Sequence, residues 1–164
     1  TSGYFPLSAI AIGKRLQDRM QEKSKRINSF AHAATYAAHP VGAAAALKTL
    51  EIMERENLIE HAAIIGGLLE RELRPLGEHP LIGEVRCHGL AVAIDFRVRG
   101  ENDMLSTEDP TGLCSRIYHD LIEDGLITRP VNGSLLIAPP LITTSDQISE
   151  ISEKVKFRLE RLTA

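Results

Sequence analysis

Residues 35–47 read TYAAHPVGAAAAL and predict the start of a long helix. Pro40 suits the first turn of a helix, where its missing N–H leaves no hydrogen bond unmade. Beyond Pro40, apolar residues recur at helical spacing and predict one apolar face: Leu47, Leu50, Met53 and Leu58. The alanines between them are small enough for this helix to pack closely against a neighbour.

Three polar side chains precede this helix: Thr35, Tyr36 and His39. A helix N-terminus presents unpaired N–H groups and a partial positive charge, so it attracts an anion such as phosphate. Thr35 and Tyr36 would add hydroxyl donors beside that anion. The alternative is that Thr35 and His39 only cap the helix and that Tyr36 packs in the core, and composition alone favours this alternative.

Upstream of this stretch, the apolar run Leu7–Ile12 lies between Pro6 and Gly13 and predicts a buried strand. Residues 13–22 are polar with helical spacing, and residues 23–30 read as a loop. A single strand cannot satisfy its own backbone hydrogen bonds. The strand therefore requires a sheet that this chain does not supply.

Downstream, residues 61–76 predict a second helix that turns Ile64, Leu68, Leu69 and Leu73 inward. Its Gly66-Gly67 pair indicates close packing. Residues 76–164 then predict a small α+β domain. Its expected parts are strands over 81–86 and 90–98, a polar surface loop over 99–110, a helix over 111–124, strands over 126–129 and 135–138, and a final helix that begins at Thr144.

Local signals support this order of elements. Val92, Ile94 and Phe96 alternate with Ala93 and Asp95, as the two faces of a strand require. Gly125 is a typical residue for ending a helix. Asn132-Gly133 supplies a tight turn, and Thr144 with Gln147 forms a capping box.

The composition excludes several classes of protein. Apolar residues make up 43% of the chain and charged residues 25%, and the net charge of −3 gives no electrostatic case for nucleic acid or an anionic membrane. No stretch of eighteen consecutive apolar residues and no basic-then-apolar leader is seen in the sequence, so neither a membrane span nor a secretory signal is expected. Cys87 and Cys114 match no metal-binding spacing and indicate a reducing, cytoplasmic compartment. The six scattered histidines predict no metal site.

Arg129 is the second candidate for a binding residue. It lies at the end of the predicted strand over 126–129, just before the turn at Asn132-Gly133. An arginine in this position can present its planar fork of N–H donors to a carboxylate. The alternative is a surface ion pair, which is the more frequent use of an arginine at a strand end.

Four segments together resemble the class III, or omega, aminotransferases. They are TSGYFPLSAIAIGKR (1–15), TYAAHPVGAAAALKTLEIMERENL (35–58), GEVRCHGLAVAIDF (83–96) and GLITRPVNGSLLIAPPLITT (125–144). The resemblance implies an α/β, aspartate-aminotransferase-like fold (PLP fold type I) with pyridoxal 5'-phosphate as cofactor. Residues 1–40 would end the large cofactor-binding domain, residues 41–75 would form the interdomain helix region, and residues 76–164 would form the small C-terminal α+β domain.

The resemblance also implies roles for individual residues. The family's Schiff-base lysine would lie three residues before Thr1, so no catalytic residue is expected in this segment. Thr35 matches the threonine that reaches the cofactor phosphate of the neighbouring subunit. Arg129 matches the arginine that binds a substrate carboxylate and swings away for an uncharged group.

At two positions the chain departs from the family. Ala38 and Cys87 stand where family members often have glycine. We expect Ala38 still to permit close packing, and Cys87 to alter a turn or to provide a free thiol.

The function implied is a transferase: the C-terminal segment of a transaminase that moves an amino group from an ω-amino acid or amine to pyruvate or a similar 2-oxo acid. Such an enzyme would be a homodimer or tetramer. Two alternatives stay open. One is an aminomutase or carbamate-forming relative on the same fold, and the other is an inactive fragment that acts only as an interaction module.

Overall fold

The structure is a computed structural model that describes residues 1–27, 34–96 and 112–163. The chain divides into two compact units, Thr1–Glu56 and Asn57–Ala164. The polar surface loop predicted over 99–110 lies outside the described residues. No helix in the described part of the chain is both long and apolar enough to cross a membrane.

In the first unit, the described residues form two helices, α1 (Lys14–Ile27) and α2 (Pro40–Arg55). Helix α1 runs past Glu22, so the loop predicted from residue 23 is wrong as far as Ile27, and residues 28–30 lie outside the described ranges. The residues that extend the helix include lysines and arginines, which favour helix. Lys25 and Arg26 in its last turn also complement the helix dipole.

The predicted buried strand at Leu7–Ile12 is not formed. These residues have no strand pairing, and Leu7, Ile10 and Ile12 are exposed. The described part of the first unit contains no other strand that could pair with this run. An apolar run of this length cannot be a buried strand without a sheet to join.

Helix α2 begins at Pro40, as the sequence predicts. Its apolar face is uncovered within its own unit, because Leu47 and Leu50 are exposed. Gly42 is its only buried residue, and a Cβ there would lie 2.7 Å from the Phe5 ring. The close packing predicted for this helix is therefore found at one glycine, beside an aromatic side chain.

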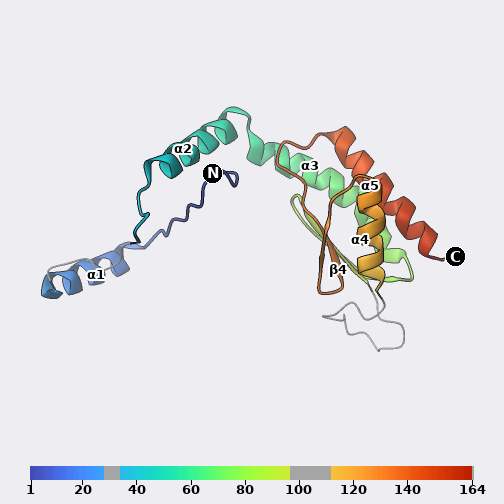
Figure 1. Ribbon diagram of the computed structural model, residues 1–164, viewed down its shortest axis with the longest axis horizontal. Coiled ribbons are helices and arrows are strands. Elements are labelled where there is room, and N and C mark those ends of the chain that lie inside the picture. Colours follow the sequence, from blue (N-terminus) through green and yellow to red (C-terminus); the bar gives the residue numbers. More distant parts are fainter. Residues whose placement is uncertain (28–33, 97–111, 164) are drawn as a thin grey trace. The chain divides into compact units, whose positions relative to one another are not determined.

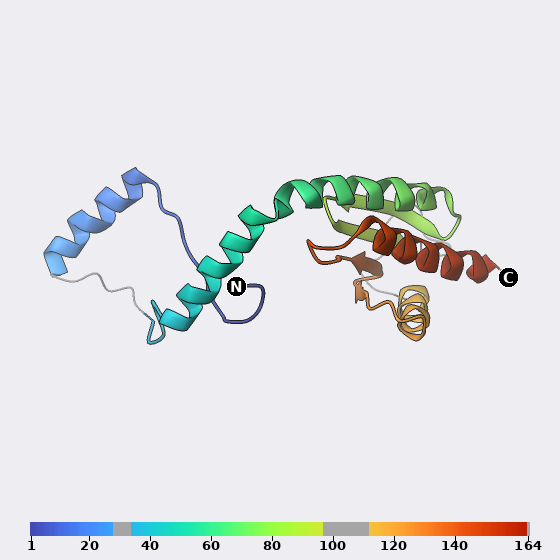
Figure 2. The same cartoon turned by 90° about the horizontal axis from the view of Figure 1, so that it is seen from above.

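The described part of the second unit forms a four-stranded antiparallel sheet with three α-helices. The strands lie in the order β1-β2-β4-β3. The strands are β1 (Ile82–His88), β2 (Ala91–Phe96), β3 (Arg129–Val131) and β4 (Ser134–Ile137). The helices are α3 (Leu58–Leu73), α4 (Leu113–Glu123) and α5 (Ser145–Glu160), with short 3-10 helices at Arg74–Glu78 and Arg161–Thr163. Figures 1 and 2 both show α3 and α5 side by side.

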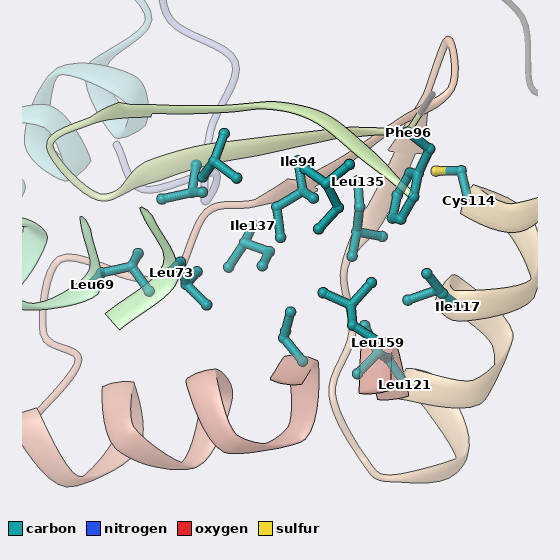
Figure 3. Close-up of a cluster of buried hydrophobic side chains, with 14 of the residues drawn as sticks. Leu69, Leu73, Ile94, Phe96, Cys114, Ile117, Leu121, Leu135, Ile137 and Leu159 are labelled. Atoms are coloured by element: carbon teal, nitrogen blue, oxygen red, sulfur yellow. The ribbon is translucent and has the colours of Figure 1, made fainter. Parts of the chain in front are cut away.

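The core lies between the sheet and these helices (Figure 3). Ile94, Phe96, Leu135 and Ile137 project from β2 and β4 and are buried. The helices contribute Leu69 and Leu73 from α3, Ile117 and Leu121 from α4, and Ile148, Val155 and Leu159 from α5.

Helix α3 begins at Leu58 rather than at residue 61, and its buried face differs by one residue from the prediction. Ile64 is 66% exposed, whereas Ile65 is buried. Ile65 is in phase with Leu69 and Leu73, and Ile64 lies about 100° around the helix from that stripe. The prediction for Ile64 is therefore wrong.

Gly66 confirms the predicted close packing of α3. A Cβ at Gly66 would lie 2.5 Å from the carbonyl carbon of Gly89, which has a φ of +56° in the turn between β1 and β2. Gly67 has open space around it. Only the first glycine of the pair therefore has a packing reason.

Strand β3 covers residues 129–131, not the predicted 126–129. Asn132 and Gly133 both have positive φ, at +49° and +76°, so they form the predicted two-residue turn. Val131 pairs with Ser134 directly across that turn, and the pairing ends at Arg129 with Leu136. Arg129 therefore opens the strand instead of closing it.

Candidate functional site

One face of the sheet is not part of the core, and Arg129 lies on it. Arg86 pairs with Ala93, Ala93 with Leu136, and Leu136 with Arg129. Directly paired residues of antiparallel strands share a face. These four positions alternate with buried neighbours such as Ile94 and Leu135, so they form a row across the opposite face. We call this the open face.

Arg129 is exposed, and its guanidinium forms no ion pair with any residue that the structure describes. The alternative of a surface ion pair is therefore not met within the described ranges. A free guanidinium has five N–H donors in a planar fork that matches a carboxylate. The geometry allows this side chain to bind an anion from outside the chain.

A charged cluster also lies on the open face, and the sequence analysis did not single it out. The Asp95 side chain is only 5% exposed. Arg86 donates to it through Nη1 and through Nη2, with Nη2 3.3 Å from Oδ1, and the Ser134 hydroxyl also donates to it. The adjacent Asp95 carboxylate raises the pKa of Arg86. The alternation along β2 could have suggested this cluster, because it places Asp95 on the face that Arg86 shares.

Before α2, His39 caps the helix and Thr35 does not. The His39 Nδ1 accepts a hydrogen bond from the Val41 N–H at 3.3 Å. The Thr35 hydroxyl makes no hydrogen bond with the described residues, and its side chain is exposed. Tyr36 is 78% exposed, so the alternative that it packs in the core is wrong. Thr35 is thus available to a group outside the chain.

Ala38 and Cys87, the two positions at which the chain departs from the family, lie in different settings. Ala38 is exposed and has a φ of +57°, a conformation that favours glycine, so backbone strain and not close packing is the cost of alanine there. Cys87 lies inside β1, paired with Val92, and so alters no turn. It is not in a disulfide, and burial raises the pKa of its thiol.

The described residues suit the phosphate group of the expected cofactor at Thr35 but offer no cluster for a metal ion. The exposed Thr35 hydroxyl, which precedes α2 in the sequence and has no hydrogen-bond partner among the described residues, can donate to a phosphate group. Within the described ranges, no group of three or more His, Cys, Asp or Glu side chains could hold a metal ion. Thr35 and Arg129 belong to different units, so each is a candidate by itself.

A hollow of about 420 Å³ lies near the start of α5 and is lined in part by Pro140, Thr144 and Lys154. The Lys154 ammonium pairs with Glu150, and Thr144 caps α5. The Lys154 ammonium and the Thr144 hydroxyl, which line the hollow, therefore already have partners within the chain. Neither residue predicted to bind a ligand lines it.

Comparison with known proteins gives a consistent result. A family profile described as aminotransferase class-III matches residues 1–159. An uncharacterized aminotransferase, y4uB, of Sinorhizobium fredii is 37% identical over 92% of this chain and 33% of its own length. The putrescine–pyruvate aminotransferase of Pseudomonas aeruginosa is 30% identical over all of this chain and 35% of its own length.

Solved structures agree with these matches. A transaminase described with L-alanine superposes with a TM-score of 0.91 and 32% identity, covering 99% of this chain and 38% of the other. An amine transaminase from an uncultivated Pseudomonas species, in its PLP-bound form, gives a TM-score of 0.88 at 32% identity, over 98% and 36%. The chain thus spans about a third of the length of these proteins.

Proposed function

Because the chain belongs to the class III aminotransferase family and has its aspartate-aminotransferase-like fold, we propose that it is the C-terminal part of a pyridoxal-phosphate-dependent transaminase. The observation that carries this proposal at the level of the site is the exposed guanidinium of Arg129 on the open face, which forms no ion pair with any described residue. In this reading residues 1–40 complete the large domain, residues 41–75 form the interdomain helix region, and residues 76–164 form the small domain.

The proposed role of Arg129 is to bind the carboxylate of a 2-oxo acid. A guanidinium and a carboxylate form two parallel hydrogen bonds, which fix the orientation of the acid. When the amino donor lacks a carboxylate at this position, the long side chain moves aside. One pocket thereby accepts two chemically different substrates in turn.

The proposed role of Thr35 is to donate a hydrogen bond to the cofactor phosphate of the neighbouring subunit. When bound, the cofactor supplies an electron sink for amino transfer. His39 and Pro40 support this role, because they cap and start α2 without using the Thr35 hydroxyl. A homodimer or tetramer and a cytoplasmic location stay predictions.

The substrates proposed are an amine or ω-amino acid as donor and pyruvate or a similar 2-oxo acid as acceptor. The names of the relatives support this class, since they include transaminases for γ-aminobutyrate, for diaminobutyrate with 2-oxoglutarate, and for putrescine with pyruvate. An aminomutase would instead keep the amino group on one carbon skeleton. Formation of alanine from pyruvate and an amine distinguishes the two reactions.

The test is Arg129→Ala in the full-length enzyme. We expect the kcat/KM for the 2-oxo acid to fall about 30- to 100-fold, since a hydrogen-bonded charge pair contributes about 2–3 kcal/mol. Turnover of a simple amine donor should change less than about 3-fold in half-reaction kinetics. Arg116→Ala, which removes an exposed arginine from α4, is the matched control. Equal losses in both half-reactions would contradict the carboxylate role.

A further inference from the structure

The open face carries two acidic side chains and two arginines from the described strands: Glu84, Asp95, Arg86 and Arg129. Glu84, Asp95 and Ser134 lie in one cross-strand row, and Arg86 and Arg129 lie at the two ends of the next row. Asp95, on β2, therefore has an arginine on each side of it on the same face, whereas Glu84, on β1, lies at the opposite edge of the sheet from Arg129.

Arg86 forms ion pairs with both acidic side chains, Glu84 and Asp95. Its Nη1 lies 3.2 Å from Oε2 of Glu84, and the same guanidinium holds Asp95 through two nitrogens. Ser134 donates a further hydrogen bond to Asp95. The buried Asp95 carboxylate therefore points toward Arg86, whose positive charge balances its negative charge. Arg129, at the other end of its row, has no acidic partner among the described residues.

The spacing between strands explains why the ion pair between Arg86 and Asp95 affects Arg129. Asp95 lies on β2 and Arg129 on β3, with one strand between them, so their backbones are about 10 Å apart across the sheet. An extended arginine side chain covers much of that distance. An unpaired carboxylate at Asp95 would therefore attract the Arg129 guanidinium and compete with an anion bound to it.

We infer that Arg86 is a positioning residue that keeps Arg129 free for a substrate carboxylate, by holding the Asp95 carboxylate of the open face. The inference rests on the proposed function of Arg129. Arg86 itself touches neither substrate nor cofactor in this account. Its effect is to hold Asp95, the intramolecular competitor of the 2-oxo acid.

The direct test is Arg86→Gln in the full-length enzyme with its cofactor. We expect the KM for the 2-oxo acid to rise about 10-fold, while kcat and the KM of a donor without a carboxylate change less than 2-fold. The double variant R86Q/D95N should restore the KM, because an amide at position 95 does not compete with the substrate. A purely structural role for Arg86 predicts no such difference between the two substrates.

Arg86→Gln leaves a buried carboxylate unpaired and therefore threatens folding. A second variant avoids this problem. Val131 is 38% exposed and lies on the open face, two residues along β3 from Arg129. Val131→Glu adds an acid beside Arg129 and leaves Arg86 intact, and we expect the same rise in KM for the 2-oxo acid. Val131→Gln is the matched neutral control and should leave that KM within 2-fold.

The outcomes separate this inference from the proposed function. An unchanged KM for the 2-oxo acid in Arg129→Ala would remove the carboxylate role and this inference with it. A raised KM in Arg129→Ala, with an unchanged KM in Val131→Glu, would overturn the inference alone. Failure of R86Q/D95N to restore the KM of a folded Arg86→Gln variant would do the same.

Discussion

Gly66 shows at the residue scale why the second unit tolerates little change where α3 meets the turn between β1 and β2. A Cβ there would lie 2.6 Å from the Gly89 carbonyl oxygen, and that contact is with backbone, which cannot rotate away. Gly67 is exposed on the same helix and meets nothing within 4 Å. The two adjacent glycines therefore form a natural matched pair.

We predict opposite effects of alanine at these two positions. Gly66→Ala should lower the free energy of unfolding by about 3 kcal/mol, the upper part of the range for overpacking. Gly67→Ala should raise it by about 0.5–1 kcal/mol, because alanine is the better helix former. Urea denaturation followed by circular dichroism measures both. A loss of similar size at both positions would show that the approach to Gly89 is not the cause.

Thr35 carries the second prediction at the residue scale. Thr35→Ala removes an exposed hydroxyl that has no partner within the described chain, so a fold-stability effect is not expected. In the full-length enzyme we expect cofactor retention during dialysis to fall about 10-fold, which corresponds to one lost hydrogen bond to a charged group. Thr35→Ser keeps the hydroxyl and should retain the cofactor. Retention equal to wild type in Thr35→Ala would leave this residue without a phosphate role.

At the scale of elements, ion pairs join the helices that cover the sheet. Arg158 of α5 reaches Asp124, just after α4, with both of its bonds at 2.6 Å. The Lys156 ammonium of α5 lies 2.7 Å from Glu72 of α3. Helix α5 is therefore tied to both of its neighbours. Its start is determined locally by the Thr144–Gln147 capping box, which the structure confirms.

The Asp124–Arg158 pair gives a prediction about pH. Hydrogen bonds from Arg158 lower the pKa of Asp124 below its usual value. A group with a lowered pKa in the folded state stabilises the fold above its unfolded pKa of about 3.9, and this contribution is lost as pH falls through the lower, folded value. Asp124→Asn should therefore destabilise the protein at pH 7, and the difference from wild type should shrink below about pH 4.

Thermal melts of wild type and Asp124→Asn between pH 7 and pH 3 measure this effect. Glu153→Gln is the control, because Glu153 is an exposed acid of α5 outside the ion pairs described. It should show little difference from wild type at either pH. A constant difference between Asp124→Asn and wild type across this range would mean that the carboxylate charge does not stabilise the fold.

At the scale of the whole molecule, the two units differ in how much they bury. The second unit has a continuous core, whereas Gly42 is the only buried residue in the described part of the first. Several large apolar side chains of the first unit are exposed: Tyr4, Ile10, Leu47 and Leu50. In the proposed enzyme this apolar surface would pack against the rest of the large domain.

We therefore predict that hydrogen exchange in the isolated 164-residue chain separates the two units. Amides of β2, β4 and α5 should be strongly protected, because their hydrogen bonds break only when the whole core unfolds. Amides of α1 and α2 should exchange close to the rate of an unfolded chain, because short helices without tertiary packing are marginal in water. In the full-length enzyme α2 should become protected. Equal protection of α2 and α5 in the isolated chain would contradict this prediction.

The sequence by itself determined the features that depend on near neighbours along the chain. Pro40 set the start of α2, Asn132-Gly133 set the turn before β4, and Thr144 with Gln147 set the start of α5. Each rests on backbone angles or hydrogen bonds within four residues, so residue type is enough to predict it. Arg129 and Thr35 also came from the sequence, through their places in the family motifs.

Only the tertiary structure decided the features that depend on residues far apart. The burial of Asp95 requires Arg86 from β1 and Ser134 from β4, and the inward turn of Ile65 rather than Ile64 requires a core to face. Leu7–Ile12 formed no strand because pairing needs a second strand, whatever the local preference. The lack of an acidic partner for Arg129 among the described residues has the same origin, since Asp95 on its face is held by Arg86, an arginine three strands away from Arg129.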